Sequence, residues 1–326
     1  MCTALSFCNG EDHYFGRTLD LEYSYCESVT VTPRDYLFRF RHMGEMKKHY
    51  AMIGMAYVVN DYPLYYEATN EKGLSMAGLR FQGNACYYAI ASEKENVTPF
   101  ELIPWILGQC ENVEQARTRL ERLNVVDESF SEELPVSPLH WILADATQAV
   151  TIECGSDGMK IHDNPVGVMT NNPPFEMQMF YLNHYLNLTA KAPENRFSNQ
   201  LHLEPYSVGM GALGLPGDMT SQSRFVRTVF HKLNSVTGTS QEEGIAQYFH
   251  IMGNVGQICG SVQTKDGRYE RTVYTSCCDT KRGVYYYTTY ENRGITGVDL
   301  YRENLNSERL ICYSLRKKLD IIMQNG

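Results

Sequence analysis

The first two residues place a cysteine directly behind the initiator methionine, in the opening MCTALSF. If Met1 is removed, Cys2 carries a thiol and a free α-amine on one residue. The thiolate is the nucleophilic form of cysteine, and an α-amine, with a reference pKa of about 7.7–8.0, can take the thiol proton near neutral pH. A cysteine at position 2 can equally be without function. Cys2 is therefore a candidate nucleophile only if other residues hold and activate it.

The stretch YFGRTLD, residues 14–20, is the first place where such residues occur. Gly16 allows two backbones to approach closely, and Arg17 and Asp20 lie three positions apart. If a strand that begins at Cys2 turns and returns through this stretch, Arg17 and Asp20 arrive beside the N-terminus. The alternative interpretation is a surface ion pair, which would contribute little to stability.

Composition narrows the class of protein. The chain has 326 residues, of which 43% are apolar and 21% charged, as in ordinary globular proteins. The net charge of −9 disfavours nucleic acid and anionic membranes as partners, because both need a basic surface. No window reaches the roughly 18 apolar residues of a membrane span, and the N-terminus lacks the pattern of a secretory signal. We therefore predict a cytoplasmic protein that binds neither nucleic acid nor membranes.

The ten cysteines and nine histidines are scattered without the spacing of metal ligands. The chain contains no C-x-x-C pair and no H-x-x-x-H pair, and Cys277 and Cys278 are adjacent. In a long chain without an export signal, reduced thiols are expected. We predict no metal site.

Strand signals occur in pairs separated by short turns, and helix signals lie between them. We predict strands in the segments 28–33, 51–59, 64–79, 141–174 and 268–292. Turns at 70–73, 145–148, 155–158 and 279–283 divide the longer segments. Strands in hairpins, with helices in between, predict an α+β layered protein with antiparallel sheets. We interpret residues 1–326 as one domain.

Three helix starts are predicted. In the first, Thr98 is the capping residue, Pro99 the first helical residue and Glu101 the third. The second opens at Asn112 and places four apolar residues on one face: Val113, Ala116, Leu120 and Leu123. The third follows TSQS at 220–223 and turns five apolar residues inward: Phe225, Val226, Val229, Phe230 and Leu233.

Six motifs carry a resemblance to a known family. They are MCT at the start, FGRTLD at 15–20, NEKGLSMAGL at 70–79, VMTNNP at 168–173, LPGDMTSQSRFVR at 215–227 and YERT at 269–272. In this order, over essentially the whole chain, they resemble the choloylglycine hydrolases, which comprise bile salt hydrolases and penicillin V acylases. The resemblance implies an N-terminal nucleophile hydrolase, a four-layer αββα sandwich of two antiparallel sheets between helix layers. It also implies that Met1 is removed, that the mature chain starts at Cys2, and that Cys2 attacks an amide carbonyl.

The resemblance further implies a role for each matching residue. Arg17 would favour the thiolate, and Asp20 would anchor the α-amine that acts as base and later as acid. Asn171 would give an oxyanion hydrogen bond from its side chain, and Arg224 would hold the polar network around the nucleophile. Without the resemblance, Asn171 would be a turn residue and Arg224 a residue on a solvated helix face.

Arg80 departs from the family's pattern. After Gly78-Leu79, bile salt hydrolases usually have Asn, and penicillin V acylases often have Tyr, as the residue whose backbone N–H completes the oxyanion hole. Because the expected donor is main chain, Arg80 is compatible with catalysis. Its guanidinium is a candidate partner for the sulfonate or carboxylate of a taurine or glycine leaving group. The alternative is a side chain that points to solvent.

Four residues at alternate positions after the FGR motif are candidates for an apolar substrate pocket: Leu19, Leu21, Tyr23 and Tyr25. They share one face of an extended segment, and a steroid or aromatic acyl group needs such a wall. The alternative is that they belong to the core. The loop 206–210 matches the family segment over the amino-acid side of the substrate, and it does not distinguish taurine from glycine.

The resemblance thus predicts a hydrolase that deconjugates glycine and taurine bile salts, small-molecule amides, through Cys2. It implies no cofactor and a homotetramer. A penicillin V acylase or another N-acyl amidase is the alternative enzyme, since it would share every catalytic residue. A non-catalytic relative that binds bile acids is a third interpretation, against which the intact set of Cys2, Arg17, Asp20, Asn171 and Arg224 argues.

Overall fold

A computed structural model describes residues 1–325 and contains two large antiparallel sheets. The first sheet has the strand order β14-β1-β2-β15-β16-β17, and the second has the order β13-β12-β11-β8-β7-β6-β3-β18. The first sheet comprises β1 (Cys2–Asn9), β2 (Asp12–Leu21), β14 (Val168–Met169), β15 (Arg271–Asp279), β16 (Val284–Thr289) and β17 (Thr296–Asp299). The second comprises β3 (Ser28–Thr32), β6 (Met52–Val59), β7 (Tyr62–Asn70), β8 (Ser75–Arg80), β11 (Leu139–Ala144), β12 (Ala149–Gly155), β13 (Gly158–Asp163) and β18 (Ile311–Ser314).

Two small sheets and eight helical elements complete the described part of the chain. The small sheets pair β4 (Phe38–Phe40) with β5 (Gly44–Met46) and β9 (Glu95–Val97) with β10 (Leu123–Val125). The α-helices are α1 (Leu102–Leu107), α2 (Val113–Leu120), α3 (Phe175–Tyr181), α4 (Ser221–Asn234) and α5 (Gln241–Gly253). The short 3₁₀ helices are η1 (Leu182–Tyr185), η2 (Met210–Ala212) and η3 (Leu300–Arg302).

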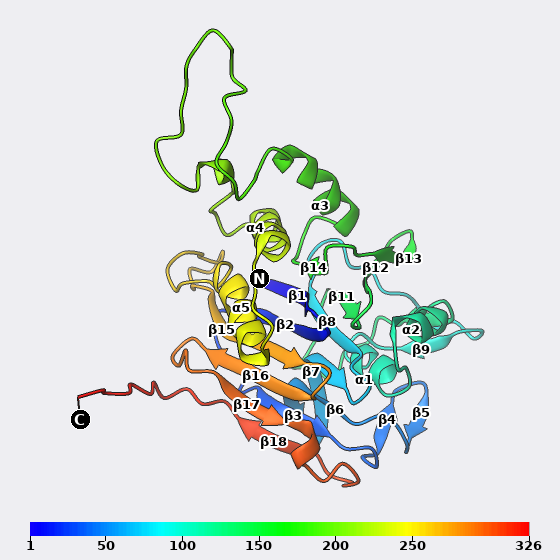
Figure 1. Cartoon of the computed structure of the whole chain (residues 1–326). Helices are drawn as coiled ribbons and strands as arrows, with labels where there is room; N and C mark the ends of the chain where they lie inside the picture. Colours follow the sequence, from blue (N-terminus) through cyan, green and yellow to red (C-terminus); the bar gives the residue numbers. More distant parts are fainter. Residues whose placement is uncertain (326) are drawn as a thin grey trace.

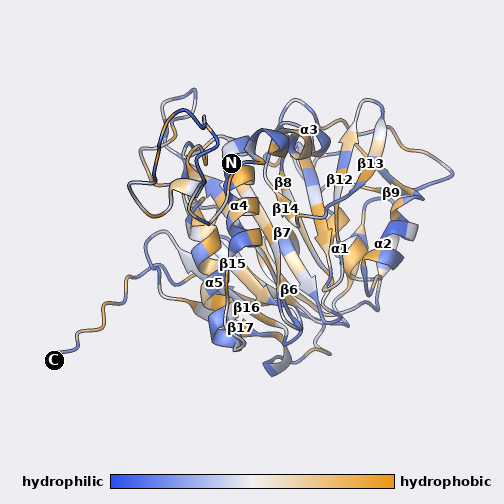
Figure 2. Cartoon of the chain, turned by 45° about the horizontal axis from the view of Figure 1, so that its top comes forward, coloured by the Kyte–Doolittle hydropathy of each residue, from blue (hydrophilic) through white to orange (hydrophobic). Residues whose placement is uncertain are grey.

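The two large sheets pack face to face, and helices cover their outer faces (Figure 1). One apolar cluster fills the space between the sheets, a second lies between the second sheet and α1 and α2, and a third lies between the first sheet and α4 and α5. Figure 2 shows apolar residues concentrated along the central strands and on parts of the helices that cover them. The predicted α+β architecture of two antiparallel sheets between helix layers is confirmed. Among residues 1–325, no helix has the length and apolar character to cross a membrane.

The first two predicted helices differ from the structure at their ends. Helix α1 begins at Leu102 instead of Pro99, because Pro99 to Glu101 form a turn. The Glu101 carboxylate nevertheless accepts a hydrogen bond from the Thr98 backbone N–H at 3.1 Å, as in half of a capping box. Helix α2 begins as predicted, with Asn112 as its cap. Leu123 lies in β10 and not on this helix, since α2 ends at Leu120.

Helix α4 buries more polar surface than its apolar pattern predicts. Phe225, Val226 and Val229 face inward as expected, but Leu233 is 64% exposed, so that assignment was wrong. Arg224 is fully buried, which contradicts the alternative of a solvated helix face for this residue. The helix therefore carries a buried cation to the first sheet as well as an apolar stripe.

A long irregular segment, residues 186–209, stands away from the sandwich between η1 and η2 (Figure 1). We call it the projecting segment. It exposes apolar side chains almost completely: Leu186, Phe197, Tyr206 and Val208 are 80–98% exposed. It includes most of the loop 206–210, which the family resemblance assigns to the amino-acid side of the substrate.

The first hairpin brings the head of the chain to its first candidate residues. Strands β1 and β2 pair from Cys2 opposite Leu19 to Asn9 opposite Asp12. A Cβ atom on Gly16 would lie 2.2 Å from the carbonyl oxygen of Ser276 in β15, so the predicted close backbone approach is confirmed. The hairpin therefore lies in the middle of the first sheet, with Cys2 at its open end.

Candidate active site

The side chains around Cys2 point to two different faces of the first sheet. Paired residues of antiparallel strands point to the same face, so the Cys2 side chain shares a face with Leu19, and Thr3 shares the other with Thr18. Cys2 and Leu19 both belong to the apolar cluster between the sheets. Residues 17 and 19 lie on one face of β2, and residues 18 and 20 on the other. Arg17 therefore approaches from the thiol side, whereas Asp20 lies on the side covered by helices.

Arg17 is buried and bridges a gap in the second sheet. The β7–β8 ladder extends only to Ala77, and one terminal nitrogen of Arg17 donates to the carbonyls of Gly78 at 2.5 Å and Tyr66 at 3.2 Å. Glu67 lies 3.9 Å from the Arg17 Nε atom. Burial opposes the charge of Arg17, but the neighbouring Cys2, Tyr274 and Glu67 raise its pKa overall. The guanidinium thus stays charged in the interior, on the same side as the nucleophile.

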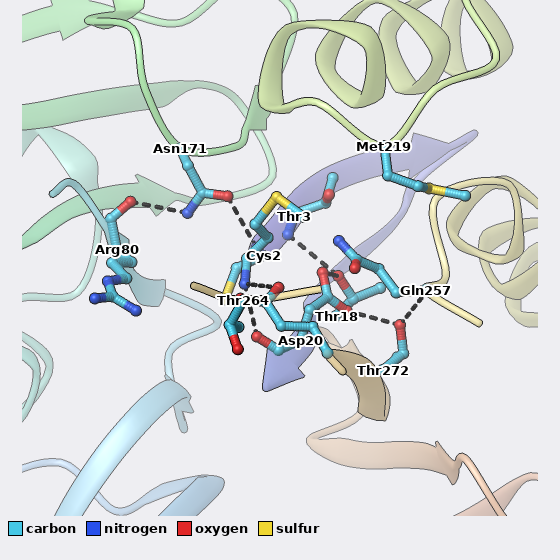
Figure 3. Close-up of polar contacts among 12 residues, drawn as sticks. Cys2, Thr3, Thr18, Asp20, Arg80, Asn171, Met219, Gln257, Thr264 and Thr272 are labelled. Carbon is cyan, nitrogen blue, oxygen red and sulfur yellow. Dashed lines mark hydrogen bonds and ion pairs between the residues drawn. The ribbon is translucent and has the colours of Figure 1, made fainter. Parts of the chain in front are cut away.

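The side chain of Asn171 lies between the main chains of Cys2 and Arg80 (Figure 3). Its Oδ1 atom accepts from the Cys2 backbone N–H at 2.9 Å and from Arg224 at 2.7 Å. Its Nδ2 atom donates to the carbonyl of Arg80 at 2.8 Å. Two donors on one atom and an acceptor on the other fix the orientation of the amide.

Arg224 reaches the main chain of the nucleophile from α4. One terminal nitrogen donates to the Cys2 carbonyl at 2.5 Å and to the Thr3 hydroxyl at 2.6 Å. Thr220 caps the helix and accepts from the Ser223 N–H, so the helix starts one turn before the arginine. Burial lowers the pKa of Arg224, and Asp20 and Cys2 act in the opposite direction.

Asp20 is buried and held by hydroxyl groups. Thr18 donates to one carboxylate oxygen at 3.1 Å, and Thr272 donates to the other at 2.7 Å. The main chain of Asp20 exchanges two hydrogen bonds with Met1. The Met1 amine also pairs with Glu270 at 2.8 Å. Asp20 is therefore next to the amine of the unprocessed chain, one residue ahead of Cys2.

The backbone of Arg80 faces the site, whereas its side chain is exposed. Arg80 lies opposite Leu139, and the next N–H, of Phe81, donates to the Pro138 carbonyl. Because bonded and non-bonded pairs alternate in an antiparallel ladder, Arg80 directs its N–H and C=O away from β11. Its carbonyl contacts Asn171, so its N–H lies on the same side. The guanidinium instead donates to Gln82 at 3.0 and 3.2 Å.

The four pocket candidates differ in burial. Leu19 is buried, and Leu21 is partly buried against the same cluster. Tyr23 and Tyr25 lie beyond the end of β2 and are 43% and 38% exposed, with their hydroxyls 2.9 Å apart. The four residues therefore form two pairs: Leu19 and Leu21 lie near Cys2, and Tyr23 and Tyr25 lie at the surface.

Sequence reasoning missed two buried polar residues near this site. Gln257 is 1% exposed, and both polar atoms of its side chain lack a hydrogen-bond partner in residues 1–325. Its backbone N–H donates to Thr272, the residue that holds Asp20. Gln178 of α3 donates to the backbone carbonyl of Asn171. Neither residue falls in a quoted motif, so no local signal pointed to them. The described residues contain no cluster of His, Cys, Asp or Glu placed to hold a metal ion.

The fold, two antiparallel sheets between helix layers, is that of the N-terminal nucleophile hydrolases, and Cys2 is the candidate nucleophile. Residues 2–313 match the family model of the linear amide C–N hydrolases of the choloylglycine hydrolase family. The chain belongs to this family, and the predicted class of enzyme, an amide hydrolase, is confirmed.

The similarity of the chain to individual proteins supports this assignment. The chain is 50% identical over 318 residues to a bile salt hydrolase/transferase of Lactiplantibacillus plantarum, which covers 98% of both chains. A mutant of the conjugated bile acid hydrolase from Clostridium perfringens superposes with a TM-score of 0.92 at 33% identity and full coverage of both chains. The penicillin V acylase from Agrobacterium tumefaciens has a TM-score of 0.73, with coverage of 95% of this chain and 90% of that one, and its 20% identity shows a shared fold alone.

Proposed function

We propose that this protein is a bile salt hydrolase: it hydrolyses the amide bond of glycine- and taurine-conjugated bile acids, with Cys2 as nucleophile. The observation that carries the proposal is the position of Asn171, whose side chain joins the main chains of Cys2 and Arg80. Three segments that are distant in sequence thus meet at the head of the chain. The names of the similar proteins from Lactiplantibacillus plantarum and Clostridium perfringens support the choice of substrate.

The first step requires a free α-amine at Cys2. Removal of Met1 turns the Cys2 backbone N–H, which donates to Asn171 Oδ1, into this amine. It also frees Asp20 and Glu270 from their contacts with the Met1 amine. The amine takes the thiol proton, and the sulfur attacks the substrate carbonyl carbon. Arg17 favours the thiolate from the interior face, and Asp20 keeps the ammonium form of the amine in place. Arg224 fixes the main chain of Cys2 from the helix face.

The tetrahedral intermediate carries a negative oxygen that needs donors. Asn171 Nδ2 and the Arg80 backbone N–H lie on the same side of β8, and we assign both to this oxygen. The amine then gives its proton to the nitrogen of glycine or taurine, which leaves, and the acyl group stays on sulfur as a thioester. Water attacks the thioester with the amine as base, and this releases the bile acid and restores the thiol.

The acyl group would lie against the apolar surface at the open end of the hairpin. Leu19 is adjacent to Cys2 in the interior cluster and Leu21 packs on it, so these two residues suit the part of the steroid nearest the scissile bond. Tyr23 and Tyr25 would contact the part that reaches the surface. An apolar wall with few polar groups is typical of sites for such ligands.

The working form would be a homotetramer in the cytoplasm. Support for an oligomer comes from the projecting segment, because it exposes Leu186 and Phe197, and contacts between subunits are one way to cover such apolar side chains. Light scattering coupled to size exclusion measures the mass in solution, and a monomer would contradict the assembly. The cytoplasmic location stays a prediction from the sequence.

The test is a panel of amide substrates on purified enzyme. Amine release from taurine and glycine conjugates, measured with ninhydrin, is expected to exceed phenoxyacetate release from penicillin V. Faster cleavage of penicillin V would favour the alternative acylase, and binding of bile acids without turnover would favour a non-catalytic relative. Intact mass is expected to be short of one methionine, and an active enzyme that retains Met1 would contradict the role of the α-amine.

A further inference from the structure

Asn171 lies in a short segment whose backbone groups are bonded by side chains from three other elements, two of them buried. His140 of β11 lies with Nε2 3.0 Å from the Thr170 carbonyl oxygen. The Ser221 hydroxyl of α4 accepts from the Asn171 N–H at 2.8 Å. The Asn171 carbonyl accepts from Gln178 of α3 at 2.6 Å. The main chain on both sides of the Asn171 side chain is therefore fixed from outside the segment.

Gln178 makes the largest number of these contacts. Its Nε2 atom donates to the carbonyls of Asn171 and Pro173, at 2.6 and 3.0 Å. Its Oε1 atom accepts from the Thr170 hydroxyl at 2.9 Å. The side chain is 1% exposed, and all three hydrogen bonds go to residues 170–173. A single buried amide thus holds three of the four residues around the oxyanion donor.

We propose that Gln178 is a positioning residue for the hydrolysis: it holds the main chain of Asn171 so that Nδ2 points to the developing oxyanion. The inference rests on the proposed function, which assigns that donor to Asn171. The single side chain of Asn171 makes three contacts, with Cys2, Arg224 and Arg80. A small shift of its backbone would therefore move the donor relative to both the nucleophile and the Arg80 N–H.

The test replaces Gln178 with a residue of similar length that cannot form hydrogen bonds. In Gln178→Met, kcat is expected to fall by about 10- to 100-fold, since a misplacement of about 1 Å can cost about 10²-fold in rate. KM should change by less than about threefold, because the donor acts on charge that develops after binding. A rise in KM with an unchanged kcat would overturn the inference.

A double-mutant cycle separates positioning from general stability. If Gln178 acts through Asn171, then Gln178→Met should change kcat by less than about twofold once Asn171→Ala is present, because there is no donor left to position. Independent effects, in which the two losses multiply, would overturn the inference. If Asn171→Ala alone leaves kcat unchanged, the failure is that of the proposed function and its oxyanion assignment.

Two further variants guard against a simple folding defect. Asn124→Leu removes a buried amide that donates to the Ala89 carbonyl and to Asn96 in the small β9–β10 sheet, so it should lower the melting temperature and keep kcat. If Gln178→Met does not fold, Thr170→Val frees the Oε1 end of the Gln178 amide, and also the Ser221 hydroxyl that donates to Thr170, with little change in volume. This variant should lower kcat severalfold in the native background and hardly at all with Asn171→Ala. Full activity of Thr170→Val would count against the inference.

Discussion

The two ends of the first hairpin bury different kinds of polar group: charged residues at the open end and a neutral histidine at the closed end. At the open end, Cys2 lies among buried charged residues, with Arg17 on one face and Asp20 and Arg224 on the other. At the closed end, next to the turn, the buried His13 ring lies between the hydroxyls of Ser6 and Thr280, at 2.9 and 3.0 Å. Burial lowers the pKa of His13 to about 4, so this ring is neutral at neutral pH.

The difference lies in what a buried polar group is required to do. Charges at the open end stay buried because each has partners: Arg224 bonds the Cys2 carbonyl, and Asp20 accepts from two hydroxyls. Such groups can stabilise charge that appears during a reaction. The neutral imidazole at the closed end is matched by hydroxyls that both donate and accept. In the proposed mechanism, the hairpin therefore separates residues that serve the reaction from residues that serve the fold.

The largest effect should come from the nucleophile. Cys2→Ser should lower kcat by about 10³-fold or more, because a hydroxyl is far harder to deprotonate than a thiol with an amine of pKa near 8 as base. The melting temperature should change little, since serine fits the same volume. Amine release at saturating bile conjugate measures the rate. Substantial activity of the serine variant would mean that the open end of the hairpin does not carry the nucleophile.

Asn171→Ala should have the next largest effect. Loss of one oxyanion donor typically costs about 10² to 10³ in rate, with a modest change in KM. Asn172→Ala is the matched control, because the Asn172 side chain donates to the carbonyl of Gln82 and not to Cys2 or Arg80. Steady-state kinetics of both variants decide the point. Equal losses in the two would show that the segment matters for its structure and not for the Asn171 amide.

The closed end should respond to pH through stability alone. The folded pKa of His13 lies below the unfolded value of about 6.5, so the folded state binds fewer protons and stability is lost as pH falls from about 6.5 to about 4. A difference of about 2.5 pKa units corresponds to about 3 kcal/mol. His13→Gln, whose amide can still bond both hydroxyls, should remove this part of the pH dependence.

Urea unfolding of both proteins at pH 7 and pH 4.5 measures the difference. Because carboxylates titrate in the same range in both proteins, only the change between wild type and variant reports on His13. The kcat at pH 7 should stay the same in His13→Gln. A variant with lower kcat and the wild-type pH dependence of stability would show that the two ends are not separate.

Much of this arrangement could be predicted from the sequence where the signal was local. The turn and alternation patterns predicted the strands around 64–79 and 268–292, and Gly16 indicated a close backbone approach, which the structure places at β15. The motifs that resemble the family pointed to Cys2, Arg17, Asp20, Asn171 and Arg224. The hairpin alone explains why the first three of these residues are neighbours.

The burial and partners of the remaining residues depend on contacts between segments that are distant in sequence, which local patterns do not predict. Without the family resemblance, helix spacing predicts a solvated face for Arg224, because an arginine beside Phe225 and Val226 gives no sign of what lies opposite it. Only the packing of α4 on β1 shows that its partners are the Cys2 carbonyl and the Thr3 hydroxyl. For the same reason, the sequence around Gln178 and Gln257 does not indicate that these residues are buried near the site. Helix periodicity predicts that Leu233 faces inward, but this residue near the end of α4 is exposed.

The smallest effect should come from the side chain of Arg80, which lies outside the buried network at the open end. Its guanidinium is exposed and bonded to Gln82, so a contact with the sulfonate or carboxylate of the leaving group would be a solvent-exposed ion pair, worth about 0.2–1 kcal/mol. At about 1.4 kcal/mol per factor of ten, Arg80→Asn should raise KM for taurine and glycine conjugates by up to about fivefold. The kcat should not change, because asparagine supplies the same backbone N–H beside Asn171.

Gln82→Ala sharpens the Arg80 experiment by releasing the guanidinium while leaving its charge in place. If the free cation reaches the leaving group, KM should stay level or fall in this variant, in contrast to Arg80→Asn. Penicillin V provides the second control, since its carboxylate is on a bulky bicyclic leaving group that holds the charge at a different distance from the scissile bond, so its KM should change less. An equal rise in KM for bile conjugates and penicillin V, or none for either, would show that Arg80 contributes its main chain only. Selection of the substrate would then fall to the apolar surface around Leu19.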